Sequence, residues 1–584
     1  MSVLVAALAA GCGGVAVWDG HEHGTGGGGE GGGSSRPAWP IERLDLLLLV
    51  DNSRAMGDKQ QVLKETLPDL VGGLVNFEPI EDIHIGIVSS SIGGHGADAC
   101  DPEKDPTQNF SVNDKAHLLS RKSVQSQEGI ATFNNLGFLA WDPAGKYGGE
   151  KDANKLLDDL GQIVNGVGEV GCGYEAPLEA WYRFLVDPDP YAKITINEKA
   201  QAVLEGTDQV LLEQRKAFLR PDSLLVIIML TDENDCSIKD GGQNYFAAQI
   251  YAPGPQSAPY HLPKPRAACA KDPNDPCCRS CGQAPGEGCD TSQDVCDGSL
   301  DPLDDGINLR CFDQKRRFGI DFLNPIDRYA AGLTSPVVPD RTGQTLPNPI
   351  FMDLDPGDDI TNVRDAGLVL ITGIVGVPWQ DIARRNSQGQ PDLLAGLNKK
   401  GKPVGGFQDA EELAENGTWD LILGDPANYV KPKDPLMWES IEPRQGTSPV
   451  TGEALAPPGA AKNANSINGH EHGWDCCALQ YACVFDLGEP RDCTDPMMVA
   501  CDCADPNNDN PLCQADDNSF GQIQYRAKAF PGLRELSLLK AVGAQAVVAS
   551  ICPRQAGDPE AADFGYRAAV AATLQRIEQL VARN

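Results

Sequence analysis

Short apolar runs alternate along the chain with segments in which apolar residues recur every three or four positions. The apolar runs predict strands at residues 44–50, 224–230, 367–379 and 546–552, the first of them buried on both faces. The isoleucines, Gly and Val of residues 82–92 predict a further strand, and residues 138–141 predict a short edge strand. The helical spacing predicts helices at residues 62–74, 151–164, 177–186, 531–542 and 566–582. Strands and helices in this order predict an α/β fold with a doubly wound, mostly parallel, Rossmann-like sheet.

Two of the predicted strands end abruptly in polar residues. The first run is followed by Asp51, Asn52 and Ser53, and the fourth by Thr231, Asp232, Glu233 and Asp235. The carboxyl ends of central parallel strands line the crevice in which ligands bind, so these carboxylates and hydroxyls are candidate ligands. The alternative is an ordinary turn whose Asp and Ser cap the next helix.

Together the two strand ends resemble the metal-ion-dependent adhesion site of von Willebrand factor A (VWA) domains, which has Asp-x-Ser-x-Ser after the first strand and an Asp after the fourth. Asp51, Ser53 and Asp232 match, whereas Ala55 stands at the last position of the motif and removes one hydroxyl. The resemblance implies a VWA-like sheet, a role in adhesion and a weak Mg²⁺ or Ca²⁺ site at the three matching residues. Glu233 or Glu175 is expected to supply an oxygen in place of the lost hydroxyl.

The resemblance also implies a disulfide. The family's metal-binding Thr aligns here with Cys172, and Cys236 lies shortly after Asp232. A Cys172–Cys236 bond at the rim of the crevice is expected to replace the Thr ligand. The open alternative is that each of the two pairs with a cysteine of the long segments described next.

Two long segments interrupt the predicted scaffold, at residues 237–364 and 381–526. Both are rich in Pro, Gly, Asp and Cys and show little periodicity, which is typical of large Cys-rich insertions that carry function. Since both leave from carboxyl ends of strands, we expect them to cover Asp51 and Asp232. They divide the VWA-like core into residues 41–236, 365–380 and 527–584.

The N-terminus and the 19 cysteines indicate an extracytoplasmic protein. Residues 1–12 end in Ala-Ala-Gly-Cys and resemble a lipoprotein signal peptide, so Cys12 is the expected lipidation site; no basic residue precedes the apolar run, and we expect the true start upstream. Residues 13–40 are Gly-rich and predict a flexible tether. We expect a lipid-anchored protein of the bacterial outer membrane, facing periplasm or exterior; the alternative is a buried N-terminal strand with an incidental cysteine.

Cysteine parity constrains the pairing. Besides Cys12, seven cysteines lie in each predicted insertion and four on the scaffold, namely Cys100, Cys172, Cys236 and Cys552. Seven is odd, so if all pair, each insertion sends at least one cysteine outside itself.

The charge balance limits the partners. The chain has 48 Lys and Arg against 83 Asp and Glu, a net charge of −35, which argues against nucleic acid. An unknown protein or cell-surface ligand and the membrane, through the lipid, are the expected partners. The acidity also favours hard divalent cations.

Three further motifs carry weaker chemistry. Asp505, Asn507, Asp509 and Asp516 have the spacing of a calcium loop, although Asn510 stands where the loop needs Gly; the alternative is an acidic disulfide-rich turn. His470 and His472 in Gly-His-Glu-His-Gly have the spacing to chelate a transition metal or belong to a chance polar loop. Residues 396–402 match a P-loop, but Pro403 replaces the Ser or Thr that holds Mg²⁺.

We therefore expect a lipid-anchored envelope protein whose VWA-like domain binds a protein or surface ligand, with possible assistance from a divalent cation, and not an enzyme. No Gly-x-Ser-x-Gly elbow is present. Two alternatives stay open: a metal-dependent extracellular hydrolase built in the insertions around His470 and His472, and a structural envelope protein with a vestigial metal site.

Overall fold

The computed structural model describes residues 39–102, 111–252, 258–456, 467, 479–495 and 501–582, with the side chains of residues 126–127 excepted. Within them, a six-stranded sheet forms the centre, with strand order β14-β11-β8-β1-β2-β5. Its strands are β1 (Arg43–Val50), β2 (Asp82–Ser89), β5 (Phe138–Trp141), β8 (Leu224–Leu230), β11 (Val369–Val375) and β14 (Ala546–Ser550). All neighbours pair in parallel except β5, which runs antiparallel to β2. The predicted α/β class and mostly parallel sheet are confirmed.

The order of the strands creates a switch point beside β1. The chain first moves outward from β1 through β2 to β5, and then returns to place β8, β11 and β14 on the other side. The register aligns Val50 of β1 with Ser89 of β2 and Leu230 of β8. The residues that follow these three strands therefore meet at one edge, which we call the carboxyl edge.

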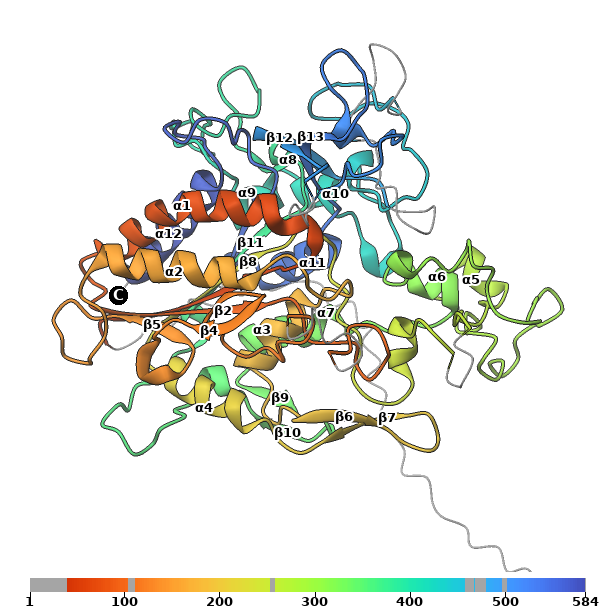
Figure 1. Cartoon of the computed structure of the whole chain (residues 1–584), viewed down its shortest axis with the longest axis horizontal. Coiled ribbons are helices and arrows are strands. Elements are labelled where there is room, and N and C mark those ends of the chain that lie inside the picture. The colour runs from red at the N-terminus through yellow and green to blue at the C-terminus, as the bar shows by residue number, and fades with distance from the viewer. Residues whose placement is uncertain are drawn as a thin grey trace, which may run out of the picture. The chain divides into compact units, whose positions relative to one another are not determined.

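Two sets of helices cover the sheet (Figure 1). One set comprises α1 (Gly57–Val75), α2 (Ala153–Val167) and α12 (Arg567–Ala582), and the other α3 (Pro177–Leu185), α4 (Gln209–Phe218), α7 (Ile326–Thr334) and α11 (Leu533–Val542). Two adjacent residues of β11 show that the two sets lie on opposite faces of the sheet, because successive side chains of a strand point to opposite faces. Thr372 bonds Thr573 of α12 at 2.9 Å, whereas a side chain at Gly373 would strike Leu539 of α11.

The core explains why the apolar runs became strands. Every residue from Leu44 to Val50 is buried, and so is every residue of β8 and β11. Strands covered on both faces need no polar alternation. Among the described residues, no helix has the length and apolar character needed to cross a membrane.

The β8–β11 connection is mostly irregular. It contains α5 (Ala268–Lys271), α6 (Gln314–Phe318), α7 and the hairpin of β9 (Val337–Pro339) and β10 (Thr345–Pro347). Helix α7 packs on α3 and α11, and its Tyr329 is fully buried. Part of this connection therefore belongs to the core of the sheet.

The β11–β14 connection carries the second group of small elements. These are α8 (Trp379–Ile382), α9 (Ala410–Glu415), α10 (Thr418–Ile422), the hairpin of β12 (Cys483–Asp492) and β13 (Ile523–Ala529), and α11. Two more hairpins lie elsewhere, one of β3 (Arg121–Ser123) and β4 (Ser126–Gly129), the other of β6 (Lys193–Ile196) and β7 (Ala202–Glu205).

The predicted Cys172–Cys236 disulfide is wrong. Cys172 is bonded to Cys100, in the loop after β2, and Cys236 to Cys311, in the β8–β11 connection. The family-based alignment placed Cys172 opposite the end of β8. In the structure Cys172 lies beside the end of β2, where Ser91 Oγ accepts a hydrogen bond from the Cys172 amide at 2.8 Å.

The parity expectation is confirmed for the described cysteines. Each connection sends one cysteine to the scaffold, through Cys236–Cys311 and Cys483–Cys552. The others close short local loops: Cys269–Cys278, Cys277–Cys289, Cys281–Cys296, Cys493–Cys501 and Cys503–Cys513.

Candidate functional site

Three strand ends bring their polar residues together at the carboxyl edge. Asp51 follows β1, Ser90 follows β2 and Thr231 follows β8. The Asp51 amide donates to the Leu230 carbonyl at 2.9 Å, which extends the β1–β8 pairing by one bond. The predicted grouping of Asp51, Ser53 and Asp232 is therefore present, and Ser90 and Thr231 join it.

The Asp51 carboxylate is fully buried and accepts hydrogen bonds on both oxygens. Oδ1 accepts from the Ser53 amide at 2.8 Å and from Ser90 Oγ at 2.9 Å, and Oδ2 accepts from Thr231 Oγ1 at 2.8 Å. Burial raises the pKa of Asp51 to about 6, and the nearby Asp232 carboxylate adds to the rise. Three neutral donors therefore hold this carboxylate.

Asp232 has a charged partner. Its Oδ2 lies 3.0 Å from the ammonium nitrogen of Lys59 without a well-aligned hydrogen bond, while Ser53 Oγ donates to Oδ1 at a long 3.5 Å. Lys59 also pairs with Asp58 Oδ1 at 2.9 Å and donates to the Ala55 carbonyl at 2.8 Å. Burial opposes the charge of Lys59, but Asp232 and Asp58 outweigh it and raise its pKa.

A roof covers this group. We use the term for the β12–β13 hairpin together with Asp502 and Phe530. The Phe530 amide donates to the Asp232 carbonyl at 2.7 Å, and the fully buried Lys528 ammonium lies 3.1 Å from Asp502 Oδ1. Burial lowers the pKa of Lys528 and raises that of Asp502. Of these residues, Asp502 belongs to the predicted second insertion and interacts with the charges of Lys59 and Asp232, whereas Lys528 and Phe530 lie in the predicted core at residues 527–584.

Glu175 and Glu233 lie next to each other in the same region. Burial raises the pKa of Glu175, and the Glu233 carboxylate raises it further; burial and then Asp232 raise the pKa of Glu233. The Glu175 carbonyl accepts from the Cys236 amide at 2.8 Å, which ties its loop to the β8 end. The site therefore holds more carboxylates than cations.

The four residues of the predicted calcium loop do not form a buried group. Asp505, Asn507, Asp509 and Asp516 are all exposed. Asp505 Oδ1 accepts from the Asn507 amide at 2.8 Å, an ordinary Asx turn, and Asn510 is buried and caps residues Pro511–Cys513. No three His, Cys, Asp or Glu side chains in the described part of the chain are grouped so as to hold a metal ion.

Several predicted features lie outside the described residues: Cys12, the tether up to residue 38, His470 and His472. The P-loop match at residues 396–402 is described, and it forms a tight turn. Asn398 and Lys402 bond through their backbones at 2.9 Å, and Leu397 bridges Pro403. No strand leads into it, so it does not have the P-loop geometry.

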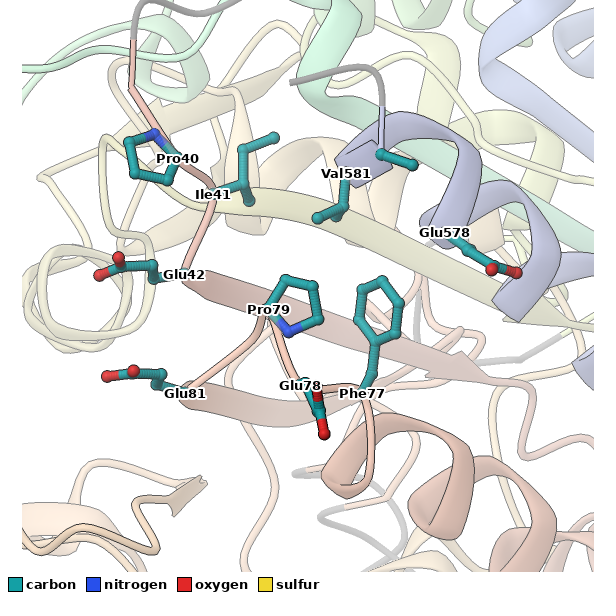
Figure 2. Close-up of a pocket in the computed structure, with 10 residues that line it drawn as sticks. Pro40, Ile41, Glu42, Phe77, Glu78, Pro79, Glu81, Glu578 and Val581 are labelled. Atoms are coloured by element: carbon teal, nitrogen blue, oxygen red, sulfur yellow. The ribbon is translucent and has the colours of Figure 1, made fainter.

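A hollow of about 570 Å³ lies at the opposite, amino edge of the sheet (Figure 2). Ile41, Phe77, Pro79 and Val581 lie around its centre, with glutamates at its margins. Glu42 and Glu81 directly precede β1 and β2. The described residues that line it include none of the buried Asp, Ser and Thr side chains of the carboxyl edge.

Four residues of this site were not predicted from the sequence, namely Lys59, Ser90, Lys528 and Asp502, and Thr231 was predicted without a specific role. The triplet Ser89-Ser90-Ser91 after β2 was an available signal, because it ends a third apolar run in hydroxyls. Lys59 lies four residues after Ala55, the position where the motif lacks its hydroxyl, and residues four apart lie on the same face of a helix. Lys528 and Asp502 come from distant segments and had no local signal.

A divalent ion at Asp51, Ser53 and Asp232 does not fit the residues as they stand. Asp51 has both oxygens engaged by neutral donors, and the position of the motif's last hydroxyl is Ala55. The Lys59 ammonium stands against Asp232 Oδ2, where an added cation would be repelled. The predicted ligands are together, but a positive charge of the protein already lies among them.

Comparisons of the chain with protein-family models, with curated proteins and with solved structures found no match. The site is therefore interpreted from its own chemistry.

Proposed function

We propose that the chain is a lipid-anchored envelope protein of the VWA-like type, which binds a protein or cell-surface ligand at the carboxyl edge of its sheet. The observation that carries the proposal is the convergence of three strand ends on one polar group beside the switch point. In doubly wound sheets this is the place where ligands bind.

The ligand contacts the rim of this edge and not the buried carboxylates. Asp51 and Asp232 have 0% of their surface exposed, so a large partner cannot reach them. Arg54 follows Ser53 directly and is exposed. An exposed guanidinium beside an ordered, disulfide-linked edge is suited to an acidic or hydrogen-bonding group of a partner.

Photo-crosslinking at the rim tests ligand binding. A photo-reactive phenylalanine analogue replaces Arg54 in the full chain, and a matched protein carries it at Lys540, an exposed residue near the end of α11 that leads to the amino edge. We expect an adduct of defined mass from position 54 in intact cells and none from position 540. Equal adducts from both positions, or none from position 54, contradict the proposal.

Anchoring is tested separately. Intact-mass analysis of the membrane fraction is expected to show a chain that begins at a lipidated Cys12, and Cys12→Ser is expected to release the protein from membranes. Stable residence needs more than one acyl chain, because a single chain binds only marginally. A Cys12→Ser protein that partitions like the wild type contradicts this part of the proposal.

A further inference from the structure

The Lys59 side chain occupies an unusual place. It is the third residue of α1, and its side chain is 1% exposed. A cation in the first turn of a helix is disfavoured by the helix dipole, and a buried ammonium is costly unless it is paired. Its position therefore needs a compensating interaction.

That compensation comes from three oxygens of three different residues. The ammonium lies 2.8 Å from the Ala55 carbonyl oxygen, 2.9 Å from Asp58 Oδ1 and 3.0 Å from Asp232 Oδ2. The contact with the Ala55 carbonyl is a hydrogen bond, and the contacts with the two carboxylates are ion pairs. The Ala55 position, which lacks the hydroxyl of the motif, contributes its carbonyl instead.

The same group links two elements that would otherwise repel. Asp58 belongs to α1 and Asp232 to the β8 end, and both are buried. Two buried carboxylates at adjacent elements disfavour each other's charge unless a cation lies between them. Lys59 supplies that cation from within the chain.

We propose that the ε-ammonium of Lys59 is the resident cation of the carboxyl edge and takes the place of a divalent ion, so that the edge keeps its structure without metal. The inference does not depend on the proposed ligand-binding function. The ammonium is a single positive charge that belongs to the chain, and it stands where a divalent ion, which can dissociate, would otherwise be needed.

The first test uses the full wild-type chain with its disulfides formed. Thermal unfolding is followed in EDTA and in millimolar Mg²⁺ or Mn²⁺, and Mn²⁺ binding is measured by electron paramagnetic resonance. We expect the same unfolding midpoint in all conditions. We also expect the wild type to bind no more Mn²⁺ than the Asp232→Asn variant. If the wild type binds a Mn²⁺ ion that the Asp232→Asn variant does not bind, the proposal is overturned.

The second test removes the ammonium. Lys59→Met keeps the length of the side chain but leaves Asp58 and Asp232 without a cation, and we expect its midpoint to fall by roughly 5–10 °C. Mn²⁺ is expected to recover at least half of that fall, because an ion that binds only the folded state stabilises it. Lys59→Arg, which keeps the charge, is the matched control and should not respond to Mn²⁺.

Each outcome of the second test decides the proposal. A Lys59→Met protein that loses no stability, or that Mn²⁺ does not rescue, overturns it. A variant that folds only with Mn²⁺ supports it. If Lys59→Met does not fold under either condition, the wild-type Mn²⁺ measurement alone decides.

Discussion

The amino and carboxyl ends of the central sheet both carry buried charges, but they balance them differently. At the amino end, Asp45 of β1 meets the guanidinium groups of Arg220 and Arg364; Nε of Arg220 donates to Asp45 Oδ1 at 2.8 Å. At the carboxyl end, the carboxylates outnumber the cations, which are the ammonium groups of Lys59 and Lys528.

The directions of the pKa shifts express this difference. Burial alone would raise the pKa of Asp45, but Arg220, His84 and Arg364 lower it below its usual value. Asp51 shows the reverse, because burial raises its pKa and Asp232 raises it further. Matched guanidinium pairs are typical of a structural role, and crowded carboxylates with raised pKa values are typical of functional sites.

The largest expected effect tests the structural role of the amino end. Asp45→Ala leaves the buried guanidinium group of Arg364 without its carboxylate and Arg220 with only its second partner, Asp82. We expect a loss of about 5 kcal/mol in the free energy of unfolding. Urea denaturation measures it. Asp355→Ala, which breaks the exposed ion pair with Lys216 at 3.0 Å, is the control and should cost less than about 1 kcal/mol. Equal losses for the two variants would remove the contrast between the ends.

A disulfide stabilises the carboxyl end, whereas ion pairs stabilise the amino end. Cys100–Cys172 joins positions 72 residues apart, and the chain-entropy model gives a loss of about 4 kcal/mol for the double variant Cys100→Ser/Cys172→Ser. The local bond Cys493–Cys501, with a separation of 8, is the control, and its removal should cost about 2–3 kcal/mol.

Peptide mapping without reduction checks the connectivity on which this prediction depends. Cys172 should be recovered with Cys100, and Cys236 with Cys311. Any other partner of Cys172 contradicts the structure described above.

The strands of the central sheet were predictable because most of their residues are apolar, although β1 contains Asp45 and β2 contains Asp82 and His84. Phe138–Trp141 was predicted at its observed bounds, and Val369–Val375 lies inside the predicted run at residues 367–379. Helix α7 was not predicted, because it lies in a segment without periodicity and owes its position to Tyr329 and Leu333, which pack on the scaffold. Packing against distant elements leaves little local signal.

The candidate site was predictable in part for the same reason. Asp51, Ser53 and Asp232 end strands that the sequence marks clearly, so their meeting followed from the topology. The partner of Asp232 depends on the register of α1, which turns Lys59 toward the sheet, and that register is a tertiary feature. The disulfide partners depend on the path of loops, which cysteine spacing does not determine.

Acid should weaken the amino end through His84. Burial, with the charge of Arg220, lowers the pKa of this ring to about 3, while its unfolded value is near 6.5. Below pH 6.5 the unfolded chain binds the proton and the folded chain does not, so stability falls as pH falls. We expect about 2 kcal/mol of the loss between pH 7 and pH 5 to come from this group.

The variant His84→Gln isolates that contribution. The groups facing the ring are the Phe218 carbonyl at 2.9 Å, Asp45 at 3.8 Å, the guanidinium groups of Arg43 and Arg220, and the rings of Phe133, Phe138 and Phe218. His84→Gln should flatten the pH dependence of urea denaturation, and the control His117→Gln, at a partly exposed ring, should leave the His84 contribution in place. An unchanged slope in His84→Gln contradicts the assignment.

The smallest expected effect is a gain in stability, whereas Asp45→Ala is expected to cause a loss. Glu233 adds a carboxylate to an end that already has too many, and it lies beside Glu175, Asp51 and Asp232. Burial and the Asp232 carboxylate raise the pKa of Glu233 to about 8, so Glu233→Gln keeps the shape and removes a charge only above that pH. At pH 9 we expect the free energy of unfolding to rise by about 1 kcal/mol or less.

Asp45→Asn is the matched control for that charge removal at the amino end, and there the same change should destabilise, because it removes a charge that Arg220 and Arg364 need. Urea denaturation of both variants at pH 9, where Glu233 and Asp45 are both ionised, compares the two signs directly. If both variants lose stability, the carboxylates of the carboxyl end are as well paired with cations as Asp45 is. The excess of carboxylates at that end then does not reduce the stability of the fold. Opposite signs mean that the protein retains these carboxylates at a cost to stability, which is expected of residues kept for binding.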